Sequence, residues 1–271
     1  MKKAKGNSAT IPLPTHLYKY HQFSATALSN LVGRKIWFSR PSSFNDPYDC
    51  RIAPKTEISD ESIERFLKAK FGDQRGAELA SKHRGTDGKF DKDTLEQLQQ
   101  RLSEDFEKLR HEMSNNRGVC CLSAKKDDLL MWSHYADSHK GFCLEFCTSD
   151  ERFARAQKVE YSKVIPTVDP VAAVLGEGHS ARTAMIFTKM KCWEYEEEWR
   201  IFHKKPSTAY GYGVNALTGI YFGSEMERAH IEIIALILKN SPTKLYRMHR
   251  SESEFQVYPE EVQYTAYDYG S

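Results

Sequence analysis

Short β-prone runs and helical-period stretches follow one another in irregular order along this chain, and this order limits its fold more than any other feature. Apolar and aromatic residues gather in short runs at 16–20, 119–123 and 141–146, whereas apolar residues recur every three or four positions within 24–31 and 127–136. No regular repetition of strand, helix and strand connects these segments. The sequence therefore predicts an α+β fold with a mixed, mainly antiparallel sheet.

The remaining elements are expected from the same two patterns. Strands are predicted at 35–39, 159–164, 196–202, 219–223, 244–250 and 254–258, and helices at 181–191 and 224–239. Ser224 and Glu227 have the spacing of a capping box, which predicts that the last of these helices begins at Ser224.

The segment 57–116 differs from the rest in having only helical periodicity. A short amphipathic helix is predicted after Ser59, and a capping box of Thr94 with Gln97 predicts the start of a longer helix. The polar, glycine-containing stretch 72–88 between them has neither pattern. We interpret 57–116 as a helical insertion, separable from the body, that serves as a lid or a partner surface.

One domain is expected at 15–271, after a flexible lead-in at 1–14. The 39 Lys and Arg against 37 Asp and Glu leave a formal net charge of +2, which does not indicate nucleic acid as a partner. The longest apolar stretch, Ile231–Leu238, is far shorter than the roughly 20 residues of a membrane span. A basic N-terminus without a following apolar segment is not typical of a signal peptide. We therefore expect a cytoplasmic protein without a membrane partner.

Common metal and cofactor motifs are missing from the sequence. The six cysteines include no Cys-x-x-Cys pair, so His134 and His139 lack the companions that a zinc site needs, and we expect free thiols and no metal. A P-loop, a complete dinucleotide-binding glycine fingerprint, H-E-x-x-H and G-x-S-x-G are also missing. These absences argue against P-loop, Rossmann, zinc-protease and serine-hydrolase functions.

Three local concentrations of reactive side chains remain, and the first is Trp132-Ser-His134-Tyr135 on the predicted helix. Trp132 and Tyr135 share a helix face, so they are either a core pair beside a solvated His134 or aromatic rings at a pocket. In the second interpretation, His134 would act as an acid, a base or a hydrogen-bond donor.

The second concentration is the charged run Glu194–Arg200. In a strand that begins near Glu196, the side chains of Glu196, Glu198 and Arg200 share one face. This run is either a solvated charged surface or a site that stabilises positive charge on a ligand.

The third concentration is Tyr18–His21 on the first strand, with Ser39 after the second strand. Together, the three concentrations are similar to segments of a known family. The sequence resembles the bacterial family known as domain of unknown function 2971. The segments that carry the resemblance are Leu17–Tyr20, Phe38–Asp49, Met131–Asp137 and Lys191–Arg200. The family label implies no reaction.

The order of the elements is also similar to that of the ADP-ribosyltransferase fold. In that fold, polar residues of the first strand hold NAD, a helix carries a Tyr that stacks on nicotinamide, and a later strand opens with a catalytic Glu. On this chain the resemblance implies Glu198 as the catalytic carboxylate, with Glu196, Tyr135 and His134 as further catalytic residues. The residues that it implies for NAD binding are Lys19, Tyr20, His21, Ser39, Trp132 and Arg200.

Our first hypothesis is an NAD-consuming enzyme, an ADP-ribosyltransferase or an NAD glycohydrolase, acting by analogy as a bacterial toxin or in phage defence. Glu198 would stabilise the oxocarbenium-like state of the ribose, and Glu196 would activate the acceptor as a general base. Arg200 would hold Glu198 ionised or bind the pyrophosphate. The expected ligand is a nucleotide-type small molecule, and the acceptor, a macromolecule, a small molecule or water, stays open.

Two other classes of function fit the same residues. A non-catalytic recognition module would use Trp132, Tyr135 and the helical insertion as a partner surface. A metal-dependent nuclease would use Asp169, Glu196 and Glu198 as ligands of Mg²⁺, although such sites usually add a Lys where this chain has an Arg.

Overall fold

A computed structural model describes residues 11–177 and 180–263. Most of the predicted flexible lead-in, residues 1–10, lies outside the described part. The fold is α+β with a mixed, mainly antiparallel sheet, as predicted. None of the helices in the described part is long and apolar enough to cross a membrane.

The main sheet has eight strands in the order β14-β13-β12-β5-β1-β4-β10-β6. Neighbouring strands are antiparallel except for β12 and β13, which are parallel. The strands are β1 (His16–His21), β4 (Gly118–Ser123), β5 (Phe142–Cys147), β6 (Gln157–Lys158), β10 (Glu198–His203), β12 (Leu217–Phe222), β13 (Lys244–Arg250) and β14 (Val257–Glu261). Three small two-stranded sheets pair β2 (Lys35–Phe38) with β11 (Thr208–Gly211), β3 (Ala53–Pro54) with β8 (Thr167–Val168), and β7 (Glu160–Ser162) with β9 (Thr188–Met190).

The two faces of the main sheet pack against different helices. Leu17, Phe146 and Ile220 belong to the core cluster that includes residues of α1 (Ala25–Val32) and α8 (Arg228–Ile237). Because side chains alternate along a strand, Tyr18 and Tyr221 face the other way, where they pack with Trp132 of α5 (Leu129–Tyr135). The aromatic residues of β1 therefore lie beside the helix that carries Tyr135.

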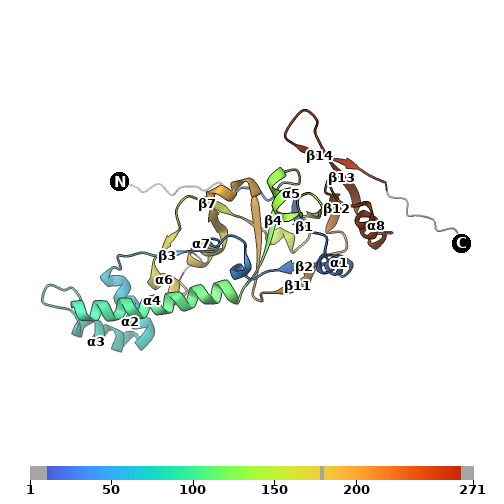
Figure 1. The fold of residues 1–271 in the computed structure, drawn as a ribbon. Coiled ribbons are helices and arrows are strands. Elements are labelled where there is room, and N and C mark those ends of the chain that lie inside the picture. Colours follow the sequence, from blue (N-terminus) through green and yellow to red (C-terminus); the bar gives the residue numbers. More distant parts are fainter. Residues whose placement is uncertain (1–10, 178–179, 264–271) are drawn as a thin grey trace.

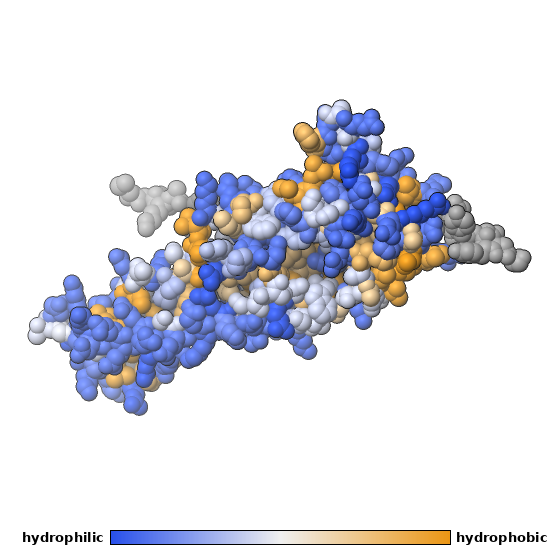
Figure 2. Space-filling model, viewed as in Figure 1, coloured by the Kyte–Doolittle hydropathy of each residue, from blue (hydrophilic) through white to orange (hydrophobic). Residues whose placement is uncertain are grey.

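The predicted insertion forms an arm of three helices that extends from one end of the molecule (Figure 1), with a largely hydrophilic outer face (Figure 2). They are α2 (Asp60–Phe71), α3 (Asp73–Lys82) and α4 (Lys92–Asn115). Phe66 and Leu102 pack against Val171 of α6 (Pro170–Leu175). Phe106 and Met113 are buried in a cluster with residues of the body. The C-terminal half of α4, which contains these two residues, is therefore part of the body's core.

The arm differs from the prediction in two respects. The long helix begins one turn earlier than expected, because Asp91 caps it by accepting a 2.8 Å hydrogen bond from the backbone of Thr94. The capping box of Thr94 with Gln97 is therefore wrong. The stretch 72–88, for which no element was predicted, contains α3, whose buried Gly76 and Ala80 pack closely against α2.

Boundaries elsewhere also differ from the prediction, and the strand expected at 254–258 lies at Val257–Glu261 as β14. The helix expected at 181–191 ends at Phe187 as α7 (Ser180–Phe187), and β9 and the 3-10 helix η3 (Lys191–Glu196) follow it. The strand expected from 196 begins at Glu198. The N-cap of α8 is Glu227 rather than Ser224, so the second predicted capping box is also wrong.

Candidate functional site

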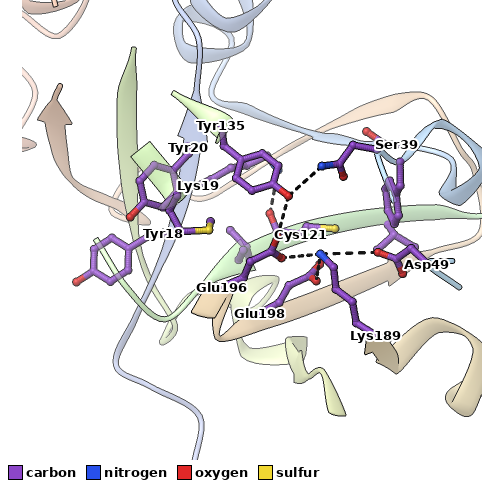
Figure 3. Close-up of a pocket in the computed structure, with 15 residues that line it drawn as sticks. Tyr18, Lys19, Tyr20, Ser39, Asp49, Cys121, Tyr135, Lys189, Glu196 and Glu198 are labelled. Atoms are coloured by element: carbon purple, nitrogen blue, oxygen red, sulfur yellow. Dashed lines mark hydrogen bonds and ion pairs between the residues drawn. The ribbon is translucent and has the colours of Figure 1, made fainter. Parts of the chain in front are cut away.

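A cavity of about 190 Å³ opens where the central strands β1 and β4 separate (Figure 3). β1 pairs with β5 along six residues, but with β4 only at Tyr18 and Ser123. The residues that line the cavity come from strands β1, β4, β9 and β10, from α5 and η3, and from the segment after β2. They are Tyr18, Lys19, Tyr20, Ser39, Phe44, Asn45, Asp49, Val119, Cys121, Leu122, Met131, Tyr135, Lys189, Glu196 and Glu198.

Lys189 joins the carboxyl groups at the bottom of this cavity. Its Nζ donates hydrogen bonds to Oε2 of Glu196 at 2.5 Å and to Oε2 of Glu198 at 3.1 Å, and lies 3.8 Å from Oδ2 of Asp49. The side chains are almost completely buried. One ammonium group therefore holds three carboxyl groups, of which Asp49 is far in the sequence from the two glutamates.

Arg200 supports the cluster from beneath, and it is fully buried. Its guanidinium pairs with Glu198 through Nε and Nη2, and with Asp49 through Nη1 and Nη2, at 2.7–2.9 Å. Nη1 also donates to the backbone carbonyl of Ile186 at 2.6 Å. These contacts use all five N–H donors of an arginine. Arg200 therefore has no donor left for a pyrophosphate, and of its two predicted roles, only holding Glu198 ionised agrees with the geometry.

The two glutamates of the cavity have opposite pKa shifts. Burial would raise the pKa of Glu198, but the charges of Arg200 and Lys189 outweigh it and lower that pKa to about 2. Burial raises the pKa of Glu196 above its ordinary value, since Lys189 offsets the desolvation only in part and Glu198 adds repulsion. Glu198 is therefore a fixed anion, and Glu196 is the carboxyl group that takes up a proton more readily.

Tyr135 reaches the same cluster from α5. Its hydroxyl donates a 2.7 Å hydrogen bond to Oε1 of Glu196, and Nδ2 of Asn45 donates to that hydroxyl at 3.3 Å. Burial, together with the neighbouring Glu196, raises the pKa of Tyr135. The phenol therefore stays protonated and orients the carboxyl group of Glu196.

A tight turn brings the two glutamates together. Glu197 has a positive φ of 42°, which ends η3 and starts β10 at the next residue. The hydroxyl of Ser123 donates to the backbone carbonyl of Glu196 at 2.6 Å, and the backbone N–H of Glu198 donates to the Tyr161 hydroxyl at 2.8 Å. The prediction that Glu196 lies on the strand is wrong, but the turn still directs both carboxyl groups at Lys189.

Six of the predicted site residues line the cavity. They are Lys19, Tyr20, Ser39, Tyr135, Glu196 and Glu198. Lys19 donates a 2.9 Å hydrogen bond from Nζ to the backbone carbonyl of Cys121, across the gap between β1 and β4. It forms no ion pair with any other residue in the described ranges, so its charge remains available to a ligand.

Four predicted site residues do not line the cavity. Trp132 is fully buried against Tyr20 and donates from Nε1 to the carbonyl of Lys126 at 2.8 Å, so it belongs to the core. His134 lies outside on the surface, where Nδ1 is 2.9 Å from the hydroxyl of Tyr195. His21 stacks on Phe142 of the opposite face. Arg200 lies beneath the cavity.

The prediction missed two residues of the charged cluster, Asp49 and Lys189. Asp49 lies in a segment that carried the family resemblance, where its turn-forming neighbours gave no reason to expect a buried ion pair. Lys189 fell within a predicted helix, 181–191, in which it had no visible partner. A buried Arg and two buried Glu need compensating charges, and that need was the available signal for both residues.

The three carboxylates of the nuclease hypothesis are not brought together. Asp169 caps α6 by accepting hydrogen bonds from the backbone of Val171 and Ala172, and it pairs with Arg65 of the arm. Glu196 and Glu198 are instead engaged by Lys189. Within residues 11–177 and 180–263, no group of three or more His, Cys, Asp or Glu is arranged to hold a metal ion.

The segment from α5 to β10 contains Tyr135, Lys189, both glutamates and Arg200. Residues 131–201 match the family described as protein of unknown function (DUF2971). The predicted resemblance to this family is thereby confirmed for that segment. No curated protein and no solved structure matches the chain. The similarity to the ADP-ribosyltransferase fold therefore stays a prediction, while the DUF2971 segment supplies most of the charged cluster.

Proposed function

We propose that this protein breaks the bond between nicotinamide and ribose in NAD and transfers the ADP-ribose to water or to another acceptor. The observation that carries the proposal is the pair of glutamates in one cavity with opposite pKa shifts. Pairs of carboxyl groups whose environments separate their pKa values are typical of acid–base and glycosidic chemistry.

Each glutamate has one role in the proposed reaction. When the C1′–N bond breaks, its electron pair leaves with neutral nicotinamide, and positive charge develops on the ribose. The anion of Glu198 stabilises that charge more than it stabilises the bound substrate, which lowers the barrier. Water then forms the new C1′–O bond and gives its proton to Glu196, whose raised pKa suits a general base.

The size of the cavity is consistent with one end of a dinucleotide. At about 190 Å³ it is smaller than the roughly 300–1,000 Å³ of sites that hold a whole drug-sized ligand. Tyr135 and Tyr20 offer aromatic walls, and Lys19 offers an unpaired positive charge. The nicotinamide ribose would therefore occupy the cavity, and the rest of NAD would lie outside it.

The test measures the release of nicotinamide and ADP-ribose from NAD, with liquid chromatography to detect the products. We expect activity in the unsubstituted protein and a loss of at least about 10²-fold in Glu196→Gln, the scale of removing a general base. Glu194→Gln is the matched control, because that side chain is 57% exposed, pairs with Lys191 and takes no part in the hydrogen bonds of Lys189. Its activity should equal that of the unsubstituted protein.

Glu198→Gln tests the anion itself. We expect a loss of at least about 10²-fold per folded molecule, as for other electrostatic stabilisers. Because this change also removes a charge from a buried cluster, the folded fraction is measured by circular dichroism in the same sample. Unsubstituted protein that neither binds nor consumes NAD would overturn the proposal.

A further inference from the structure

A second hollow, of about 230 Å³, lies directly behind the charged cluster. Lys189 lines both hollows. The chain segment 48–51 also contributes to the lining of both hollows, because Asp49 lines the first cavity whereas Tyr48 and Arg51 line the second. The two hollows are therefore adjacent and share Lys189.

Exposed apolar side chains gather around the second hollow. Tyr48 is 54% exposed and Val164 is 76% exposed, and Ile165 and Met190 are 40% and 48% exposed. Figure 2 shows apolar side chains beside β7, where the arm meets the rest of the molecule. Such a patch on a single protein chain marks a binding surface more often than an accident of composition.

The charges around this hollow have one sign. Arg51 and Lys163 line it, and no acidic residue does. Neither cation forms an ion pair within the described part of the chain, whereas Lys189 is held by its three carboxyl groups. The guanidinium of Arg51 lies over the ring of Tyr48, 5.6 Å from its centroid. The hollow thus combines an exposed aromatic ring with two cations that have no anionic partner.

We propose that the second hollow binds a nucleoside diphosphate, with the base against Tyr48 and Met190 and the phosphates against Arg51 and Lys163. Bases stack on exposed aromatic rings, and an arginine fork matches phosphate oxygens. ADP is the nucleoside diphosphate chosen because it carries both an aromatic base and two phosphates, and the choice of adenine as the base rests on the proposed function, in which NAD is the substrate. An acidic peptide could also pair with the two cations, but it has no base to stack on the ring of Tyr48.

The experiment is calorimetric titration of the full chain with ADP, which lacks nicotinamide and gives no turnover. We expect ADP to bind, and Arg51→Gln and Tyr48→Ala each to weaken binding by about tenfold, the scale of losing one phosphate contact or one stacked base. Arg75→Gln on α3 and Tyr258→Ala on β14 are matched controls, since both side chains are exposed and remote from the hollow. All four changes lie on the surface, and thermal melting confirms that each variant is folded.

The outcomes separate this inference from the proposed function. Absence of ADP binding, binding that Arg51→Gln and Tyr48→Ala leave unchanged, or equal binding of a poly-glutamate peptide would overturn the inference, even if NAD is consumed. ADP binding that depends on Arg51 and Tyr48 would support it, even if NAD is not consumed, and that second result would overturn the proposed function alone.

Discussion

Arg200 and Glu198 are joined by two parallel hydrogen bonds, Nε to Oε1 at 2.7 Å and Nη2 to Oε2 at 2.9 Å, although both side chains are buried. The same guanidinium makes a second fork with Asp49. Buried ions are tolerated only when their hydrogen-bonding capacity is met, so the cluster is stable as a whole and unstable when one member is lost.

The first prediction concerns this pairing. Arg200→Gln should destabilise the fold by about 3–5 kcal/mol, because it leaves Glu198 and Asp49 buried without their shared cation. Urea unfolding measures the change. Arg155→Gln, whose side chain is 71% exposed, should cost less than about 1 kcal/mol. Equal stabilities of the two variants would contradict the structural role of Arg200.

The second prediction separates Trp132 from Tyr135. Trp132→Ala should destabilise by about 3–5 kcal/mol, because it empties a fully buried position. Tyr135→Phe should cost only about 1 kcal/mol, the value of one hydrogen bond, but it should impair NAD turnover because Glu196 loses its orienting donor. Thermal melting measures the stability of the two variants, and the chromatographic assay measures their NAD turnover. Equal losses of stability would mean that Tyr135, like Trp132, serves only the core.

The third prediction is a pH dependence of stability. The pKa of Glu198 is lowered from 4.5 to about 2 on folding. Its contribution to stability is therefore fully present above about pH 4.5 and is lost as pH falls towards 2, because the unfolded chain binds the proton first. Between these pH values, the free energy of unfolding measured with urea should fall less steeply with decreasing pH in Glu198→Gln than in Glu194→Gln. An identical decline in both variants would refute the assignment.

Glu196 should have the opposite dependence. Since folding raises its pKa, its ionisation costs stability as pH rises through the folded-state pKa. Glu196→Gln should remove that component, so the variant should lose less stability than the unsubstituted protein as pH rises above about 4.5, the ordinary pKa of the carboxyl group. The same urea series, extended upwards in pH, measures the difference.

The fifth prediction concerns the arm. Phe106→Ala should destabilise the whole protein by about 3–5 kcal/mol, because Phe106 is buried in a cluster shared with the body. Phe90→Ala should loosen only the arm, because Phe90 packs with Ile63, Leu67 and Ala80 of the arm itself. Hydrogen exchange with peptide-level resolution distinguishes the two. Removal of residues 58–115 would also remove Phe106 and Met113, so we expect it to damage the body.

The main strands and the aromatic helix were predictable because their apolar spacing is set by burial on one face. Residues 16–20 and 141–146 became β1 and β5, with boundaries that differ by one residue. The association of Tyr135 with the glutamate strand came instead from the resemblance to the ADP-ribosyltransferase fold. These features depend on local pattern and on simple topology, which a sequence carries directly.

The rest of the site depends on contacts between distant segments. The pairing of Arg200 with Asp49 spans 151 residues, and no local pattern indicates it. The positive φ of Glu197 interrupts the alternation on which the prediction for Glu196 relied. Asp91 replaced Thr94 as a cap because both residue types accept hydrogen bonds, and only the path of the preceding chain selects one.

The single backbone pairing between β1 and β4 has a consequence for access to the cavity. In a continuous sheet, a ligand could enter between two central strands only after a series of backbone hydrogen bonds had been broken. Here the Nζ of Lys19 donates a hydrogen bond to the carbonyl of Cys121, in place of a backbone N–H from a neighbouring strand. A lysine side chain changes rotamer within nanoseconds, whereas strands separate by local unfolding. The swing of this one side chain can therefore widen the gap between β1 and β4 while the sheet itself stays intact.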